Sequence, residues 1–266
     1  MFPLYTSLFP ASAPDLSDLL NASVQRLFAN APCPVAVRDE NYPRLAEITI
    51  TLDGAELRSD PPRPPRVQDG GSGPGVEIGQ LHLQANEASL GPAIASIRLD
   101  ARNLVLNRGT DANGEIVLVL KSAADGQIEA SAETQQIESA IAAVAKQEAA
   151  KHGVTIDQVQ LSVRPRGERS LDADVQLRAK KLFFTTVIKI AAKLDLDEQL
   201  NATVSGLTCS GDGAIGSLAC GVLQPHLQKI DGRSVSLLAL PLGEIRLREV
   251  RLAAGDRISV RAEFGA

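Results

Sequence analysis

The chain has 266 residues, of which 44% are hydrophobic, and its formal net charge is −5 at pH 7. This composition excludes a disordered chain and argues against nucleic acid as a partner, because a surface that follows phosphates needs clustered excess cations. Aromatic residues make up only 3% and Trp is absent, so we expect a core that is thin or that a ligand completes.

The N-terminal region predicts an amphipathic helix. Ser12 and Asp15 have the spacing of a capping box, and Pro14 lies in the expected first turn. Pro32 and Pro34 end the pattern. The apolar residues that recur at helical spacing are Leu16, Leu19, Leu20, Val24, Leu27 and Phe28.

Targeting signals are weak in this sequence. The first ten residues hold no Lys or Arg and are interrupted by Pro3 and Pro10, which is a poor signal peptide. No stretch approaches 18 uncharged apolar residues. We therefore expect a soluble, cytoplasmic protein, with peripheral contact to a membrane surface as an open alternative.

The three cysteines, Cys33, Cys209 and Cys220, do not have the spacing of a metal site. Buried free thiols in a reducing compartment are the favoured interpretation. A bridge between Cys209 and Cys220 is a second possibility that the sequence leaves open.

Five segments in the first half alternate as strands do: 44–57, 76–85, 92–107, 115–121 and 126–132. The turns "DANGE" and "AADGQ" predict hairpins in an antiparallel meander. Residues 59–75 are rich in Pro and then in Gly, which predicts a flexible loop within a single domain over 1–266.

Residues 133–152 predict the longest helix, whose apolar stripe is narrow and rich in Ala. Strands are expected to resume at 154–165, and a short helix is expected near 217–230, before closing strands. Strands on both sides of one long helix, without a β-α-β rhythm, favour an α+β fold with an antiparallel sheet.

An unusually long alternating segment covers residues 171–196. Its apolar side chains fall on odd positions up to Ala179 and on even positions from Phe184 onward. A long hairpin is expected over 169–209. At the change of phase near Lys180 and Lys181 the strand must bend or break, and a bulge would do both. This predicts a long, highly curved sheet wrapped around the long helix, forming a half-tube with an apolar groove. The residues expected to line the groove are Ile137, Ala140, Ile141, Val144, Phe184, Ile188, Ile190 and Leu194.

Motifs that carry chemistry are scarce. Gly211, Gly213 and Gly216 form G-x-G-x-x-G, but the elements expected around them are not those of a dinucleotide site. We interpret them as a tight turn before a short helix capped by Ser217. The three histidines are isolated and no catalytic motif is present, so we expect no catalytic residues, cofactor or metal.

The run from Lys193 through "VSGLTCSGDGAIGSLACGVLQ" to the closing "GDRISVRAEFG" resembles the tubular lipid-binding (TULIP-like) domains of bacteria. With the order helix, strands, helix, strands, the resemblance covers roughly residues 14–265. It implies non-catalytic binding or transport of a lipid or another elongated hydrophobic ligand. It supplies no individual ligand-binding residues.

Three functions therefore compete. The favoured one is a lipid or hydrophobe carrier; the others are an assembly module whose groove binds a partner peptide, and a nucleotide-binding enzyme that uses the turn at Gly211–Gly216. A homodimer is compatible with the sequence but not required by it.

Overall fold

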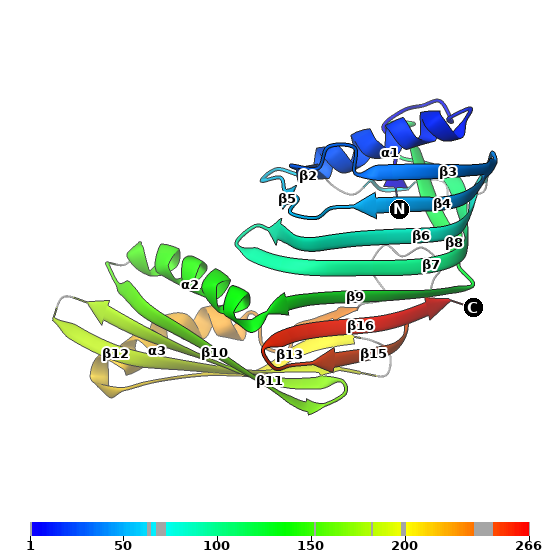
Figure 1. The fold of residues 1–266 in the computed structure, drawn as a ribbon. Coiled ribbons are helices and arrows are strands. Elements are labelled where there is room, and N and C mark those ends of the chain that lie inside the picture. The colour runs from blue at the N-terminus through cyan, green and yellow to red at the C-terminus, as the bar shows by residue number, and fades with distance from the viewer. Residues whose placement is uncertain are drawn as a thin grey trace.

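The computed structural model describes residues 2–62, 65–67, 73–151, 153–181, 183–197, 201–236 and 247–265 (Figure 1). Strands account for 59% of the chain and helices for 19%, so the fold is mostly β. Two sheets and three helices make up this described part. The expected α+β class, with a long curved sheet wrapped around a long helix, is therefore wrong.

The first sheet has eleven strands and is mixed. Its main order is β15-β16-β9-β7-β6-β4-β3, and β4 pairs with β6 in parallel while the other pairs along this path are antiparallel. Its strands are β1 (Phe2–Pro3), β2 (Phe28–Ala29), β3 (Val35–Asn41), β4 (Arg44–Thr51), β5 (Glu56–Leu57), β6 (Gly73–Leu90), β7 (Ala93–Thr110), β8 (Ile116–Ser122), β9 (Asp125–Glu133), β15 (Leu247–Ala253) and β16 (Arg257–Gly265).

The predicted meander is only partly correct. β7 and β8 form the hairpin expected at "DANGE", where Gly114 has a φ of 77°. β8 and β9 do not pair; instead β9 pairs with the first half of β7, from Ser96 to Arg102, and with β16. One edge of the long strand β7 therefore pairs first with β9 and then with β8, while its other edge pairs with β6. Local turn chemistry does not reveal this arrangement.

Helix α1 (Ala13–Leu27) begins where its capping residues predict. The Ser12 side chain accepts a hydrogen bond from the Asp15 amide at 3.3 Å, and Pro14 lies in the first turn. Leu16, Leu20 and Val24 are buried on one side of the helix. They join the core of the first sheet, which α1 covers.

The second sheet has five antiparallel strands in the order of the sequence. They are β10 (Thr155–Gly167), β11 (Ser170–Lys181), β12 (Phe184–Leu196), β13 (Asn201–Gly211) and β14 (Ser234–Ser236). The predicted long strand over 171–196 is two strands: β11 and β12 pair antiparallel from Ser170↔Asp195 to Lys181↔Phe184. The change of phase near Lys180 and Lys181 therefore marks a hairpin turn and not a bulge.

Helices α2 (Thr134–Ala150) and α3 (Gly213–Gln228) pack on the second sheet. α2 lies on β10 and also touches β7 and β9, while α3 lies on β12 and β13. At 17 residues, α2 is about 25 Å long. Figure 1 shows it along one side of the sheet, which does not wrap around it. The hairpin folds the apolar segment 171–196 back on itself. The sheet therefore forms one layer beside the helices and not a half-tube.

Two further sequence expectations need correction. Residues 73–75 of the predicted 59–75 loop belong to β6, where a Cβ on Gly75 would approach the Leu106 carbonyl oxygen to 2.3 Å. Residues 63–64 and 68–72 of that loop lie outside the described residues.

The short helix begins at Gly213 with Asp212 as its N-cap, while Ser217 lies inside the helix and donates to the Gly213 carbonyl.

Candidate functional site

The second sheet has one apolar face, which we call the inner face. Odd positions of β11 and even positions of β12 lie side by side on it, as Val175↔Ile190 and Leu177↔Ile188 show. The predicted alternation is thus confirmed as a division into two faces. The apolar side chains that share the inner face are Ile156, Val159, Leu161, Val163, Leu171, Ala173, Val175, Leu177, Ala179, Ile188, Ile190, Ala192, Leu194 and Leu196.

Among the described residues, both helices contact the inner face mainly through small side chains, with Ile141 and Leu223 as the two larger ones. α2 contributes Ile141 and three alanines, and α3 contributes Cys220 with two neighbours. Small side chains fill little volume between a helix and a sheet. The helix residues packed in this cluster are Ile141, Ala142, Ala145, Ala149, Ala219, Cys220 and Leu223.

The structure brings three of the predicted groove residues together. Ile141 from α2 packs in one cluster with Ile188 and Ile190 from β12. On α2, Ala140 is buried and Ile137 half-buried, but neither belongs to that cluster. Val144 is 50% exposed. The four predicted groove residues of α2 therefore do not share one environment.

The other two predicted residues lie at opposite ends of β12. Leu194 packs in a separate cluster with Leu171, Val250 and Ala262, where strands of the first sheet cover the inner face. Phe184 is 59% exposed beside the turn between β11 and β12. The predicted lining set is therefore not one site.

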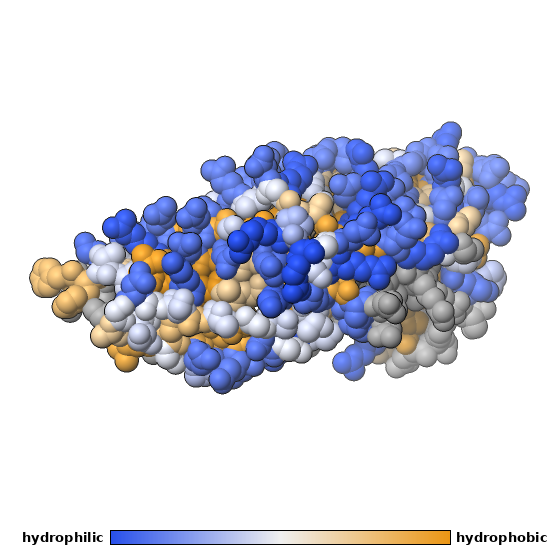
Figure 2. Space-filling model, turned by 90° about the horizontal axis from the view of Figure 1, so that it is seen from below, coloured by the Kyte–Doolittle hydropathy of each residue, from blue (hydrophilic) through white to orange (hydrophobic). Residues whose placement is uncertain are grey.

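The inner face is less completely covered than the core of the first sheet. Among the described residues, the large side chains with less than 2% exposure all belong to α1 or to the first sheet and its N-terminal segment. Val175, Ile190 and Leu161 on the inner face keep intermediate exposure. Figure 2 shows hydrophobic residues gathered at the surface of the end formed by the second sheet.

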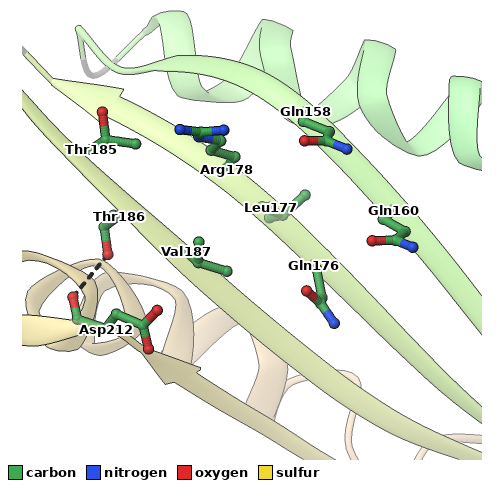
Figure 3. A pocket seen from close by; sticks show the side chains of 9 residues that line it. All are labelled: Gln158, Gln160, Gln176, Leu177, Arg178, Thr185, Thr186, Val187 and Asp212. Carbon is green, nitrogen blue, oxygen red and sulfur yellow. Dashed lines mark hydrogen bonds between the residues drawn. The ribbon is translucent and has the colours of Figure 1, made fainter.

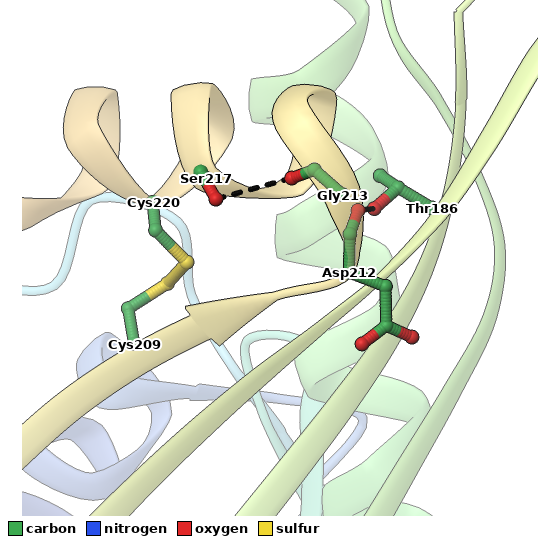
Figure 4. Close-up of a disulfide and its surroundings, with 6 residues drawn as sticks. All are labelled: Thr186, Cys209, Asp212, Gly213, Ser217 and Cys220. Carbon is green, nitrogen blue, oxygen red and sulfur yellow. Dashed lines mark hydrogen bonds between the residues drawn. A yellow bond between two sulfur atoms is a disulfide. The ribbon is translucent and has the colours of Figure 1, made fainter.

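A disulfide ties α3 to the inner face. Cys209 of β13 and Cys220 of α3 are bonded, with their Cα atoms 5.5 Å apart (Figure 4). Cys33 is a free, exposed thiol. The expectation of three buried free cysteines is therefore wrong, and the bridge that the sequence left open is present.

The glycine-rich turn serves close packing between β13 and α3. A Cβ on Gly216 would lie 2.5 Å from the Gly211 carbonyl carbon and 2.7 Å from the Thr186 hydroxyl. Thr186 also donates to the Asp212 carbonyl at 2.9 Å (Figure 4). The backbones therefore occupy the space that a phosphate would need, and the Asp212 carboxylate stands at the N-cap, where it would repel an anion.

The opposite face of the second sheet, which we call the outer face, holds a pocket of about 300 Å³ whose lining mixes polar and apolar surface (Figure 3). Amides, hydroxyls, a guanidinium and a carboxylate surround it together with two aliphatic residues, but no histidine or cysteine does. Its polar groups offer hydrogen bonds to a polar molecule. Its residues are Gln158, Gln160, Gln176, Leu177, Arg178, Thr185, Thr186, Val187 and Asp212.

An ionic network lies on the outer face near the other end of β12. The Ser170 hydroxyl donates to Asp195 at 2.8 Å, and Arg166 pairs with the same carboxylate. The Ser170 hydrogen bond has the largest effect and lowers the pKa of Asp195. Desolvation opposes it, and the contacts with Arg166 and the charge of Lys193 lower the pKa further. These contacts link the β10–β11 turn to β12 and have no catalytic geometry.

Within the described part of the chain, no group of His, Cys, Asp and Glu has the arrangement of a metal site. None of the described helices is both long and apolar enough to cross a membrane. Comparison with known proteins found no matching family model, no matching curated protein and no matching solved structure.

Sequence reasoning missed one exposed feature. Phe183, in the turn between β11 and β12, is 95% exposed and stands next to Phe184. The signal in the sequence was the pair of adjacent Phe residues at the change of phase, which a hairpin places at a turn. Treating the change of phase as a bulge placed Phe184 inside the groove instead.

Proposed function

We propose that the chain binds an elongated hydrophobic ligand, such as a lipid acyl chain, on the inner face of the second sheet, without catalysis. One observation carries the proposal: a continuous apolar face is covered by two helices with small contact residues and retains partly exposed Val175 and Ile190. An apolar surface of this kind gains free energy when a ligand removes it from water.

The nucleotide alternative has less support. The Gly211 and Gly216 backbones pack against each other, and Asp212 occupies the helix N-cap. A partner peptide on the inner face remains an outcome that the experiment below distinguishes from a lipid.

The proposed setting is an oxidising compartment. The bond between Cys209 and Cys220 supports it, because disulfides persist in such compartments and are rare in the reducing cytoplasm. This proposal replaces the cytoplasmic location expected from the sequence.

Native mass spectrometry of protein purified without detergent tests the proposed function. We expect bound mass that organic solvent extracts and that fragments as a lipid. Ala145→Trp places a bulky ring among the inner-face contacts of α2 and should reduce the bound fraction, whereas Ala143→Trp, on the exposed side of the same helix, should not. Bound peptide, or an apo mass from protein that also takes up no added fatty acid, would overturn the proposal.

A further inference from the structure

The turn between β11 and β12 projects two aromatic side chains into solvent. Phe183 is 95% exposed and Phe184 59% exposed, and together we call them the tip. The chain has only six Phe and no Trp, so a third of its Phe residues stand at this one turn. In Figure 1 the turn lies at the far left, at the end of the molecule away from the first sheet.

The charge around the tip differs in sign from that of the whole chain. Between Asp174 and Asp195 the sequence holds five cations and no acid, although the net charge of the chain is −5. Strand register places Lys180 opposite Thr185 and Arg178 opposite Val187, directly behind the tip. Four of the five, Arg178, Lys180, Lys181 and Lys189, lie within six residues of Phe184 in the sequence, whereas Lys193 lies opposite Asp172 near the other end of β12.

Two acids lie near these cations. Asp212 borders the same outer-face pocket as Arg178, and the exposed Asp157 of β10 lies at the register shift between the partners of Ala179 and Arg178. Among the described residues, no ion pair within 4.0 Å involves Arg178, Lys180 or Lys189. The cations are therefore available to an external anionic surface.

We propose that the tip docks on an anionic phospholipid membrane, with Phe183 and Phe184 inserted among the lipid chains and the exposed Arg178 and Lys180 against the headgroups. Aromatic side chains suit the interface of a bilayer, and each basic side chain near an anionic surface adds to the attraction. This step goes beyond ligand binding on the inner face, because it names the surface on which such a ligand would be exchanged.

Vesicle binding tests the proposal on the full chain. Vesicles of phosphatidylcholine and phosphatidylglycerol in equal parts should bind the protein, and vesicles of phosphatidylcholine alone should bind it much more weakly. The double variant Phe183→Ala/Phe184→Ala should lose at least about tenfold in affinity. Arg178→Gln/Lys180→Gln should lose about fivefold for each cation removed. Both variants should keep the wild-type melting temperature, since the side chains are exposed.

Matched controls sit elsewhere on the surface. Leu8→Ala removes an exposed hydrophobic side chain, and Arg98→Gln/Lys121→Gln removes two exposed cations of the first sheet. These variants should bind anionic vesicles as the wild type does. Equal losses in the tip variants and the controls, or equal binding of both vesicle types by the wild type, would overturn the proposal.

A single-tryptophan variant gives a second measurement, because the chain has no Trp of its own. The emission of Phe183→Trp should shift to the blue and be quenched by brominated lipid when anionic vesicles are added, whereas that of Leu8→Trp should not change. If the emission shifts to the blue as protein concentration rises in the absence of vesicles, the tip contacts a second copy of the chain. That result would overturn membrane docking. Uptake of fatty acid by the Phe183→Ala/Phe184→Ala variant, measured separately, keeps failure of docking distinct from failure of the proposed function.

Discussion

The two sheets of this protein bury their apolar residues to different extents. In the first sheet, α1 and long paired strands enclose side chains such as Leu45 and Leu104 at 0% and 2% exposure. The inner face of the second sheet has two short helices above it, and the structure leaves Ile190 and Val175 partly exposed. Among the described residues, the two regions differ in how much of each face is covered by other elements. The first sheet has a closed core, whereas the second has a partly exposed apolar face, on which we propose that a ligand binds.

The strongest test of the two faces of the second sheet uses neighbouring residues on β12. Ile190→Asp puts a carboxylate on the inner face, and Lys189→Asp puts one on the outer face. We expect Ile190→Asp to destabilise the fold by several kcal/mol, because it removes the apolar contacts of a half-buried side chain and sets a charge among apolar neighbours. Lys189→Asp should change stability by about 0.5 kcal/mol or less. Chemical denaturation measures both. Equal effects would show that alternation does not separate an inner from an outer face.

Matched truncations sharpen the comparison of the two sheets. Leu104→Ala in the first sheet should cost about 4 kcal/mol, since it leaves a cavity in a closed core. Leu161→Ala on the inner face should cost about 2 kcal/mol or less, because its side chain is partly exposed. Urea unfolding of both variants measures the difference. A Leu161→Ala cost as large as that of Leu104→Ala would mean that the inner face is as closed as the first core.

The disulfide should contribute a smaller but clear share of stability to the second sheet. Replacing both Cys209 and Cys220 with Ser should lower the unfolding free energy by about 2–3 kcal/mol, as expected for a short closed loop. Reductant should lower the melting temperature of the wild type but not that of the double variant. Cys33→Ser, at the exposed free thiol, is the control and should behave as the wild type.

The smallest expected effect concerns acid. The pKa of Asp195 is lowered in the folded protein, so its contribution to stability is fully present above its unfolded pKa and is lost as pH falls through the folded value. Stability should therefore decline in a step below about pH 4 that Asp195→Asn removes. Melting temperatures of the wild type and of Asp195→Asn, measured across this pH range, show whether stability falls with pH as expected. An identical acid decline in the Asn variant would assign the step to other carboxyls.

Local signals predicted the elements better than their pairing. The capping residues Ser12 and Asp15 located α1, and alternation located β11 and β12, because helix caps and strand faces depend on neighbouring residues. A bulge and a hairpin turn both invert the phase, so residues 180–184 did not distinguish one bent strand from two. The pairing of β9 with β7 depends on contacts distant in the sequence, which no local pattern encodes.

In the candidate site, too, features that depend on neighbouring residues were predicted better than contacts between distant elements. Ile188 and Ile190 were placed correctly on an apolar face with Ile141, since period and spacing fix which side chains share a surface. Phe184 was misplaced because its exposure depends on the hairpin turn, and Leu194 because the first sheet covers its end of β12. The Cys209–Cys220 bridge required the position of α3 on β13, which sequence spacing alone did not give.

Titration with a solvatochromic fatty-acid probe tests the central claim most directly. The folded wild type should bind the probe saturably, shift its emission to the blue and release it when phospholipid extract is added. Ala145→Trp should weaken this binding while Ala143→Trp leaves it unchanged. A folded wild type that neither shifts the probe nor saturates would contradict the account, because the inner face would then be closed to hydrophobic ligands.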